Sequence, residues 1–503
     1  MDAALGRAVS MGMALSSTRS IAELQAEAER PTLRRALGPL NLTALGIGSV
    51  IGTGIFVLTG TAASQNSGPA LVISMIIAAV ACALAGLCYA ELASLIPVAG
   101  SAYTYAYASS GELVAWIIGW DLILEYALSG ATVAVGWSGY FVSFLRDLGL
   151  ALPPELTAAR GASAVLADGR VVPGVFNLPA AGIVLLVTGL LVIGIRQSAN
   201  TNTALVLLKT GVLIMFVALG AAYVRRENLV PFVPPNTGEF GHFGWSGVMR
   251  GAAVMFFAYV GFDAVSTAAQ EARNPQRDMP IGILASLAIC TVLYIAVAVV
   301  LLGIVPYQRL NVADPIAVGI DATGLTWFSP VVKVSALFGL FSTMLVQLLG
   351  QTRIFFSMSR DGLLPDIFSR VHPTFRTPWM STIITGTVVA TAAGLLPIGI
   401  LSQLVSIGSL LAFLLVCVGV VILRRTAPAV PRPFRVPAVP WVPALGGLTC
   451  FACMLSLPRA TWERLVIWMA LGFVIYFVYS RQRAQARRRE RDGLVETAAP
   501  IGG

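Results

Sequence analysis

An apolar segment that glycines interrupt constrains the fold of this chain most strongly. Residues 40–61 read LNLTALGIGSVIGTGIFVLTGT, about the length that a membrane helix needs. Its centre holds Gly46, Gly48, Gly52 and Gly54, and glycine loses more backbone freedom in a helix than alanine does. A break here would free N–H and C=O groups in the bilayer, where lipid cannot satisfy them. A small molecule with a carboxylate and an ammonium could satisfy these groups, so the segment predicts a transporter.

The composition predicts a membrane protein. The chain is 57% hydrophobic and 11% charged, whereas a soluble domain has about 25% charged residues. The first 38 residues are polar and show no secretory signal, so we expect an uncleaved first span. We predict twelve spans, at residues 40–61, 68–96, 112–145, 176–195, 201–224, 246–270, 279–305, 328–352, 378–396, 399–423, 439–458 and 461–480.

Basic residues predict the orientation. With the N-terminus in the cytoplasm, 22 of the 33 lysines and arginines lie on the cytoplasmic side and 9 on the outer side. This asymmetry predicts a multi-pass protein of the cell (inner) membrane with both termini cytoplasmic. The run Arg487-Arg488-Arg489 directly after the last span favours contact with anionic lipid headgroups over nucleic acid.

The cysteines predict no metal or cofactor. All six lie in apolar spans, and the two histidines lie in loops. Cys450 and Cys453 form a C-x-x-C motif, but no second pair accompanies it. We interpret the six as buried packing residues.

A second anomaly lies in the sixth predicted span, where FFAYVGFD places Gly261 and Asp263 deep in the membrane. An aspartate there costs about 2.5–3.5 kcal/mol unless it faces protein or water. Spans one and six hold equivalent positions in two five-span halves, residues 40–224 and 246–423. Paired interruptions of this kind indicate an inverted repeat with a site at its centre. Glycine-mediated helix packing is the alternative interpretation.

Helix dipoles predict what such a site would bind. The second half of span one begins near Thr53 with free N–H groups, which suit a carboxylate. The first half of span one ends near Gly48 to Val50 and the first half of span six near Phe257 to Val260, both with free carbonyls, which suit an ammonium. Together these ends predict a binding site for an α-amino acid.

Four motifs resemble the amino acid–polyamine–organocation (APC) superfamily, in particular bacterial members of the cationic amino acid transporter subfamily. The resemblance covers residues 38 to 480, and its motifs are GIGSVIGTGIF at 46–56, YAEL at 89–92 with PVAGSAY at 97–103, FFAYVGFD at 256–263 with EARNP at 271–275, and QTR to SRDGLLP at 351–365. It implies an all-α polytopic membrane protein with a LeuT-type 5+5 inverted repeat, twelve transmembrane helices, and helices 1 and 6 broken.

The resemblance also implies site residues. The substrate carboxylate would meet the amides of Thr53 and Gly54, and the ammonium would meet the carbonyls of Val50, Phe257 and Val260. Phe257 would be the aromatic gate above the substrate. The implied substrate-binding set is Val50, Gly52, Thr53, Gly54, Phe257, Ala258 and Val260.

Lys209 in span five is the candidate for proton coupling. A lysine in a membrane can direct its ammonium to the headgroups, but this chain has only two lysines. A desolvated lysine can lose its charge near neutral pH, and an arginine cannot. Similar proton-driven transporters place a lysine here, where it reaches the broken first helix.

Glu125 in span three is a second candidate. Asp121 and Glu125 are four residues apart and would share a helix face. A membrane carboxylate faces the bundle interior and often relays protons. A structural hydrogen bond that braces the first helix is the equal alternative. Glu91, near a helix end, favours a structural or gating role.

We therefore expect a secondary active transporter that couples protons to L-amino acids by alternating access. The alternatives are a cationic (Arg/Lys/ornithine) amino acid exchanger or an amino acid sensor, and no enzyme is predicted, because no nucleophile or metal cluster lies in the spans. The sequence leaves open whether a small accessory membrane subunit binds. The expected organisation is a cytoplasmic tail at 1–38, a transporter domain at 39–480 with two extra helices at 439–480, and a basic tail at 481–503.

Overall fold

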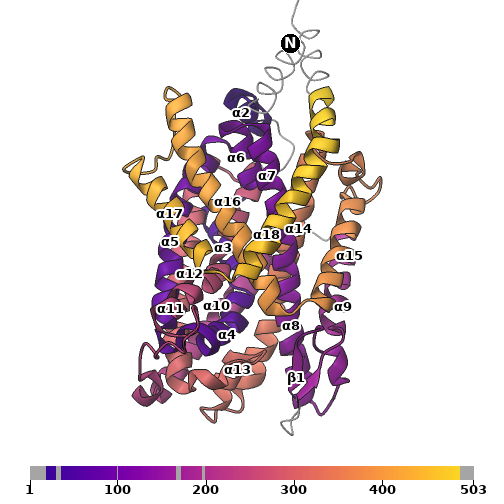
Figure 1. Cartoon of the computed structure of the whole chain (residues 1–503). Helices are drawn as coiled ribbons and strands as arrows, with labels where there is room; N and C mark the ends of the chain where they lie inside the picture. Colours follow the sequence, from indigo (N-terminus) through magenta and orange to yellow (C-terminus); the bar gives the residue numbers. More distant parts are fainter. Residues whose placement is uncertain (1–17, 30–35, 99, 166–170, 195–198, 488–503) are drawn as a thin grey trace, which may run out of the picture.

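The computed structural model describes residues 18–29, 36–98, 100–165, 171–194 and 199–487, which form a bundle of helices (Figure 1). Eight described helices are long and apolar enough to cross a membrane, and four shorter apolar helices accompany them. The chain is therefore a mostly helical polytopic protein. The long and short helices after the first span are α5 (Leu71–Leu95), α7 (Glu112–Leu122), α8 (Leu128–Asp147), α9 (Leu178–Ile193), α10 (Ala199–Gly220), α11 (Gly244–Phe256), α12 (Pro275–Ile304), α14 (Phe328–Arg360), α15 (Trp379–Leu395), α16 (Ile398–Thr426), α17 (Trp441–Ser456) and α18 (Arg459–Ile475).

The first predicted span is interrupted where its glycines lie. Helix α3 (Pro39–Val50) ends at Val50, and Ile51 and Gly52 are not helical. The chain resumes as the π-helical turn η1 (Gly54–Leu58), then α4 (Thr59–Ala62), η2 (Ala63–Ser67) and η3 (Gly68–Ala70). Gly68 has a φ of +58°, which separates this half-helix from α5. The prediction had the break correctly between Val50 and Thr53.

The sixth predicted span is also interrupted. Helix α11 passes into the 3₁₀ turn η8 (Phe257–Tyr259), and the 3₁₀ segment η9 (Phe262–Glu271) follows. Between them Val260 is extended and Gly261 has a φ of +117°, a conformation open to glycine at little cost. The aromatic cluster therefore ends one half-helix, and Asp263 lies in the first turn of the next.

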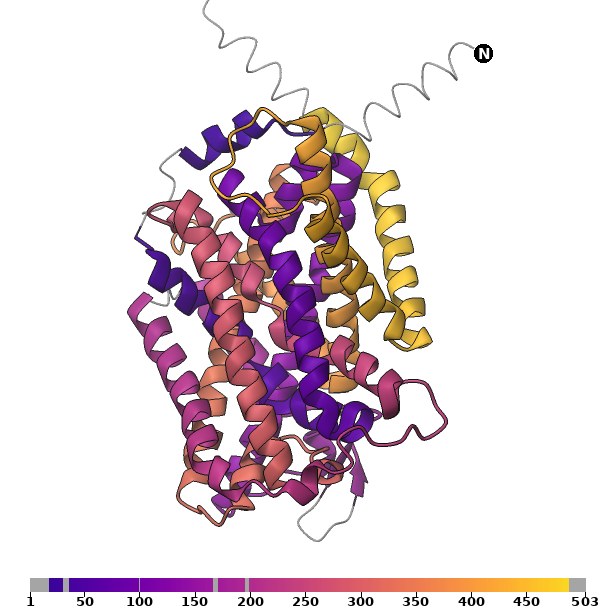
Figure 2. The ribbon, with the colours of Figure 1, turned by 90° about the vertical axis from the view of Figure 1, so that its left-hand side faces the viewer.

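Both described ends of the chain lie at the same end of the bundle (Figures 1 and 2), here called the terminal face. It carries α2 (Ile21–Glu29) and α6 (Ser101–Ser109). The opposite face carries α13 (Pro315–Asp321) and a hairpin of β1 (Ser163–Val165) with β2 (Val171–Pro173). Single-turn helices in the loops are η5 (Pro154–Leu156), η6 (Ala221–Tyr223), η7 (Arg226–Leu229), η10 (Tyr307–Arg309) and η11 (Asp366–Ser369).

The outer faces of the bundle are apolar. Large exposed side chains include Leu207 and Ile214 on α10 and Val466 and Ile467 on α18. A soluble protein rarely exposes so large an apolar surface, and a helix in lipid satisfies its own backbone hydrogen bonds. These faces therefore suit acyl chains.

The last helix extends beyond its predicted end at residue 480. After α18 it continues through the π-helical turn η12 (Tyr476–Ser480) to Arg487. Arg483 and Arg487 donate hydrogen bonds to Asp366 at 2.7 and 3.0 Å. Burial alone would raise the pKa of Asp366, but the two arginines outweigh it and lower that pKa below its ordinary value. The predicted lipid contact of Arg488 and Arg489, and most of the predicted 1–38 tail, lie outside the described residues.

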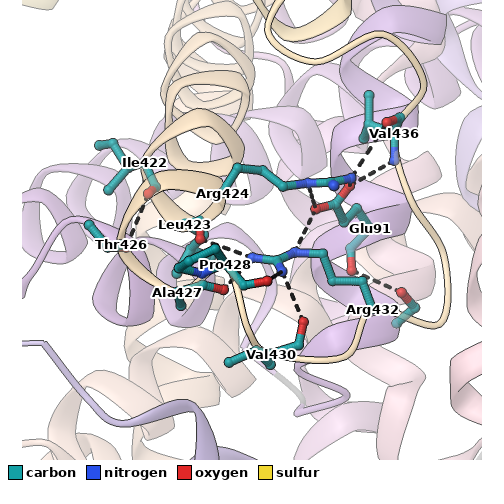
Figure 3. A network of polar contacts seen from close by, with 11 residues as sticks. Glu91, Ile422, Leu423, Arg424, Thr426, Ala427, Pro428, Val430, Arg432 and Val436 are labelled. Atoms are coloured by element: carbon teal, nitrogen blue, oxygen red, sulfur yellow. Dashed lines mark hydrogen bonds and ion pairs between the residues drawn. The ribbon is translucent and has the colours of Figure 1, made fainter.

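A buried ion-pair network fastens α5 to α16 near the terminal face (Figure 3). Glu91 on α5 accepts hydrogen bonds from Arg424 at 2.9 and 2.7 Å and from the Val436 amide at 2.7 Å, and it pairs with Arg432 at 3.2 Å. Arg432 also donates to the Leu423 carbonyl on α16 and to the Ala427 and Val430 carbonyls of the loop that follows. The Glu91 carboxylate therefore binds both the end of α16 and the loop that follows it.

Substituting Glu91→Ala is expected to destabilise the protein by about 3–5 kcal/mol, because it leaves buried arginine charges without their partner. The measurement is the thermal unfolding midpoint of the purified protein in detergent. Arg459→Ala is the control, since the Arg459–Glu463 pair is exposed and such pairs contribute about 0–1 kcal/mol. Equal midpoints for the two variants would contradict the role given to Glu91.

Candidate functional site

The two helix breaks lie against each other at two points. A methyl group on Gly54 would lie 2.3 Å from the Ala258 Cα atom, and one on Gly261 would lie 2.7 Å from Ser49 Oγ. Real Cβ atoms essentially never come this close to other heavy atoms, so both glycines are needed for the contact. The structure thus brings together the two segments that the sequence singled out, at the centre of the bundle.

The start of η1 offers backbone N–H groups toward this contact. The turn begins at Gly54, directly after Thr53, and the first amides of a helix have no partner inside it. Thr53 is fully buried, and its hydroxyl has no hydrogen-bond partner in the described part of the chain. Gly52 lies before it, and its carbonyl accepts from Ile55 and Phe56 at 3.2 Å. This half-helix end has the chemistry of an anion site.

Two of the three carbonyls expected to receive an ammonium already have protein donors. The Val50 carbonyl accepts from the Tyr294 hydroxyl at 2.8 Å, and the Phe257 carbonyl accepts from the Val260 amide at 3.1 Å. A carbonyl has two lone pairs, so each can accept once more. Phe257, Ala258 and Val260 are all buried, and they face η1 through the contact of Ala258 with Gly54.

Lys209 points at the first break rather than at the headgroups. Its side chain is fully buried, and Nζ donates to the Gly48 carbonyl, to the Ile51 carbonyl at 2.8 Å and to Thr343 Oγ1 at 3.2 Å. Its stem packs against Gly339 on α14. All three hydrogens of the ammonium are thus used, and they hold the end of α3 that the interruption leaves unsatisfied.

Thr343 is a residue that sequence reasoning missed. Its hydroxyl lies within 3.1 Å of the carbonyls of Gly48, Ile51 and Gly339, so α14 contributes directly to the same cluster as Lys209. The sequence signal was a threonine in an apolar helix, which more often bonds only to its own backbone. Tyr294 was missed because nothing in the sequence shows which helix its hydroxyl reaches.

A second polar cluster surrounds Glu125. Glu125 lies in the π-helical turn η4 (Ile123–Ala127), between α7 and α8. Nearby, Asp263 accepts from the Tyr126 hydroxyl at 2.5 Å and from Ser101 at 3.5 Å. These bonds tie η9 to η4 and to α6 near the terminal face. The structure therefore places Lys209 and Glu125 in two separate clusters.

The second lysine of the chain and the six cysteines are structural. Lys333 pairs with Asp147 at 2.6 Å near the opposite face. The six cysteines are buried and unbridged. Within the described ranges, no group of three or more His, Cys, Asp and Glu residues is placed to hold a metal ion.

Comparisons with known proteins show the family of the chain. The sequence profile of the family described as "Amino acid permease" matches residues 37–478. The chain is 47% identical to the methylthioribose transporter of Bacillus subtilis (strain 168), covering 92% of this chain and 96% of that protein. It is also 47% identical to the branched-chain amino acid permease BcaP of the same organism, and the match covers 90% of this chain and 95% of that protein. The vacuolar cationic amino acid transporter 4 of Arabidopsis thaliana is 39% identical over 79% of this chain and 64% of its own.

Proposed function

This chain belongs to the amino acid permease family of the APC superfamily, and we propose that it is a secondary active transporter that couples protons to the movement of L-amino acids by alternating access. The observation that carries this proposal is the contact of the two broken helices, with Lys209 bonded to the break in α3. Free amides at η1 would bind the carboxylate, and carbonyls at the ends of α3 and η8 would bind the ammonium.

We propose that the helices form two inverted five-helix repeats and two extra helices, which would give a twelve-helix LeuT-type bundle. The packing supports it, because the main contacts between the two halves occur in symmetric pairs. Helix α3 packs on α12 as α11 packs on α5, and α10 packs on α14 as α16 packs on α8. The short helices α6 and α13 occupy equivalent places in the two halves and lie at opposite ends of the bundle (Figure 1). An odd number of crossings per repeat explains that inversion.

The terminal face would be cytoplasmic, because most basic residues flank the helix ends on that side. The protein would then lie in the cell (inner) membrane with both termini inside. In this arrangement Lys209 and Glu125 would exchange protons with the two sides in turn, and Phe257 would close over the substrate. An anionic bilayer surface would meet the C-terminal tail.

The substrate class is proposed as neutral L-amino acids, with cationic amino acids as the alternative. The names of the similar proteins give different substrates. One is a branched-chain amino acid permease, one is a cationic amino acid transporter, and one is a methylthioribose transporter. We place the substrate side chain near spans eight and ten, around Met344, Gln347, Ser406 and Ile407, which are all buried. They are uncharged, which favours an uncharged side chain.

A ligand screen tests the proposal. The purified protein is heated with each of the twenty L-amino acids and with methylthioribose, and a ligand that binds the folded form raises the unfolding midpoint. We expect one or a few neutral L-amino acids to shift it, and the same amino acid to show counterflow in proteoliposomes. Binding without counterflow would indicate a sensor. A shift with methylthioribose alone would contradict the carboxylate and ammonium sites, because that sugar carries neither group.

A further inference from the structure

Asp121 is a buried acid that the proposed transport cycle leaves without a role. It is the last acidic residue of α7, its side chain is fully buried, and neither carboxyl oxygen has a hydrogen-bond partner among the residues that the structure describes. Glu125, one turn further along, is also buried, and neither of its carboxyl oxygens has a partner within hydrogen-bond distance among these residues. Since buried polar groups are almost always hydrogen-bonded, four orphaned carboxyl oxygens at one place require an explanation.

The backbone at this place is irregular. Asp121 lies just before the π-helical turn η4, and Glu125 lies within it. Such single-turn π segments occur frequently at functional sites, because the extra residue redirects side chains. Here the segment directs two carboxyl groups toward the same neighbour, α16, which packs on both α7 and η4.

Helix α16 makes room for the acids and presents a hydroxyl to them. A methyl group on Gly408 would lie 3.2 Å from Asp121 Oδ1, so the absence of a side chain there admits the carboxyl. The next residue, Ser409, faces Glu125. Its hydroxyl is fully buried and has no other hydrogen-bond partner in the described part of the chain. This free donor on a second helix points to a built polar site.

The cluster has no countercharge. The charged groups that act on Glu125 are Asp121 and Asp263, both acidic, and no ion pair joins any of the three to a basic residue within the described ranges. Lys209 is occupied at the break in α3. Like charges this close disfavour joint ionisation, so the cluster must hold a proton or a cation.

We propose that Asp121 and Glu125 form a second proton site, in which Asp121 is the group that exchanges the proton with the terminal face. Asp121 precedes Glu125 on a span that runs from the terminal face toward the opposite face (Figure 1), so it lies on the outlet side. The proton leaves an oxygen of Glu125 as an oxygen of Asp121 binds it, and Asp121 then gives it to water when this face opens. The inference rests on the proposed proton-coupled transport.

The test compares two readouts in proteoliposomes, with the amino acid that gives the largest shift in the ligand screen as the probe. The first readout is counterflow at equal pH, which needs only substrate binding and conformational change. The second is accumulation driven by a proton gradient, with proton uptake followed by an enclosed pH dye. For Asp121→Asn we expect counterflow within about 3-fold of wild type and a loss of about 10-fold or more in driven accumulation, with rescue by Asp121→Glu.

Glu112→Gln is the matched control, because Glu112 is a buried acid with its own partners, Tyr476 and Tyr107. It should keep both readouts. Asp121→Asn with wild-type accumulation and proton uptake overturns the inference, as does a selective loss of lysine and arginine transport, which would mean that Asp121 binds the substrate side chain. If the Asn variant does not fold, infrared spectra of the wild type decide, and a protein without a protonated carboxyl band overturns the inference. A wild type that takes up no protons with substrate contradicts the proposed coupling itself.

Discussion

Replacing Lys209 with alanine is expected to abolish amino acid uptake driven by a proton gradient. Its ammonium is the donor that joins the carbonyls of Gly48 and Ile51 to Thr343 Oγ1, so α3, α10 and α14 meet at one group. A proton leaving this amine would weaken all three bonds together, which would let α3 move relative to α14. Alanine removes both the proton carrier and the link, and each unsatisfied buried carbonyl costs about 1–3 kcal/mol.

The measurement is accumulation of labelled amino acid in proteoliposomes with an inward proton gradient and without one. Lys333→Ala is the matched control, because Lys333 is the other lysine of the chain and pairs with Asp147 near the opposite face. It should keep the response to the gradient. Lys209→Arg should lose it as alanine does, since arginine does not release its proton. A Lys209→Ala protein that responds to the gradient like wild type would contradict the coupling role.

The sequence predicted the two breaks closely because glycine content and depth in the membrane are local properties. α3 ends at Val50 and η1 begins at Gly54, and the second interruption falls at Val260 and Gly261. Both agree with the expected half-helix ends. The number of spans agrees less directly with the helices of the structure. Between predicted spans one and two, helical structure continues from Gly54 to Leu95, and the positive φ of Gly68 marks the turn between them. Four of the predicted spans contain helices shorter than 18 residues.

The partners across helices could not be predicted, because they depend on how each helix is rotated. Thr343 is a threonine in an apolar helix, and nothing local distinguishes it from a threonine that bonds only to its own backbone. For Tyr294, nothing local shows which neighbouring helix its hydroxyl reaches. Lys209 was singled out because lysine is rare in this chain, because a desolvated lysine can lose its charge, and because similar transporters place a lysine there. None of these grounds identified the atoms to which it bonds. The orphaned state of Asp121 was likewise invisible, since a partner on α16 would have been equally compatible with the sequence.

Gly54→Ala is expected to remove substrate binding and transport together. The added methyl would lie 2.3 Å from the Ala258 Cα atom and 2.5 Å from its Cβ atom. Overpacking in a close-packed interior costs about 1–3 kcal/mol, but the functional cost is larger, because a displacement of about 1 Å in a positioning group can cost about 100-fold. We therefore expect the rate of counterflow to fall by about 100-fold. The shift of the unfolding midpoint with amino acid should disappear.

Gly189→Ala on α9 is the matched control, since no atom lies within 4 Å of the position of its added methyl and alanine favours a helix over glycine. It should bind and transport like wild type. Adding Ala258→Gly to Gly54→Ala removes the contact with the Cβ atom but leaves the backbone clash with the Cα atom, so the double variant should stay inactive. Full rescue would mean that the side chain of Ala258, and not the approach of the two backbones, sets the distance between the broken helices. Wild-type binding by Gly54→Ala alone would show that the substrate does not depend on this contact, and the site would have to be sought away from the breaks.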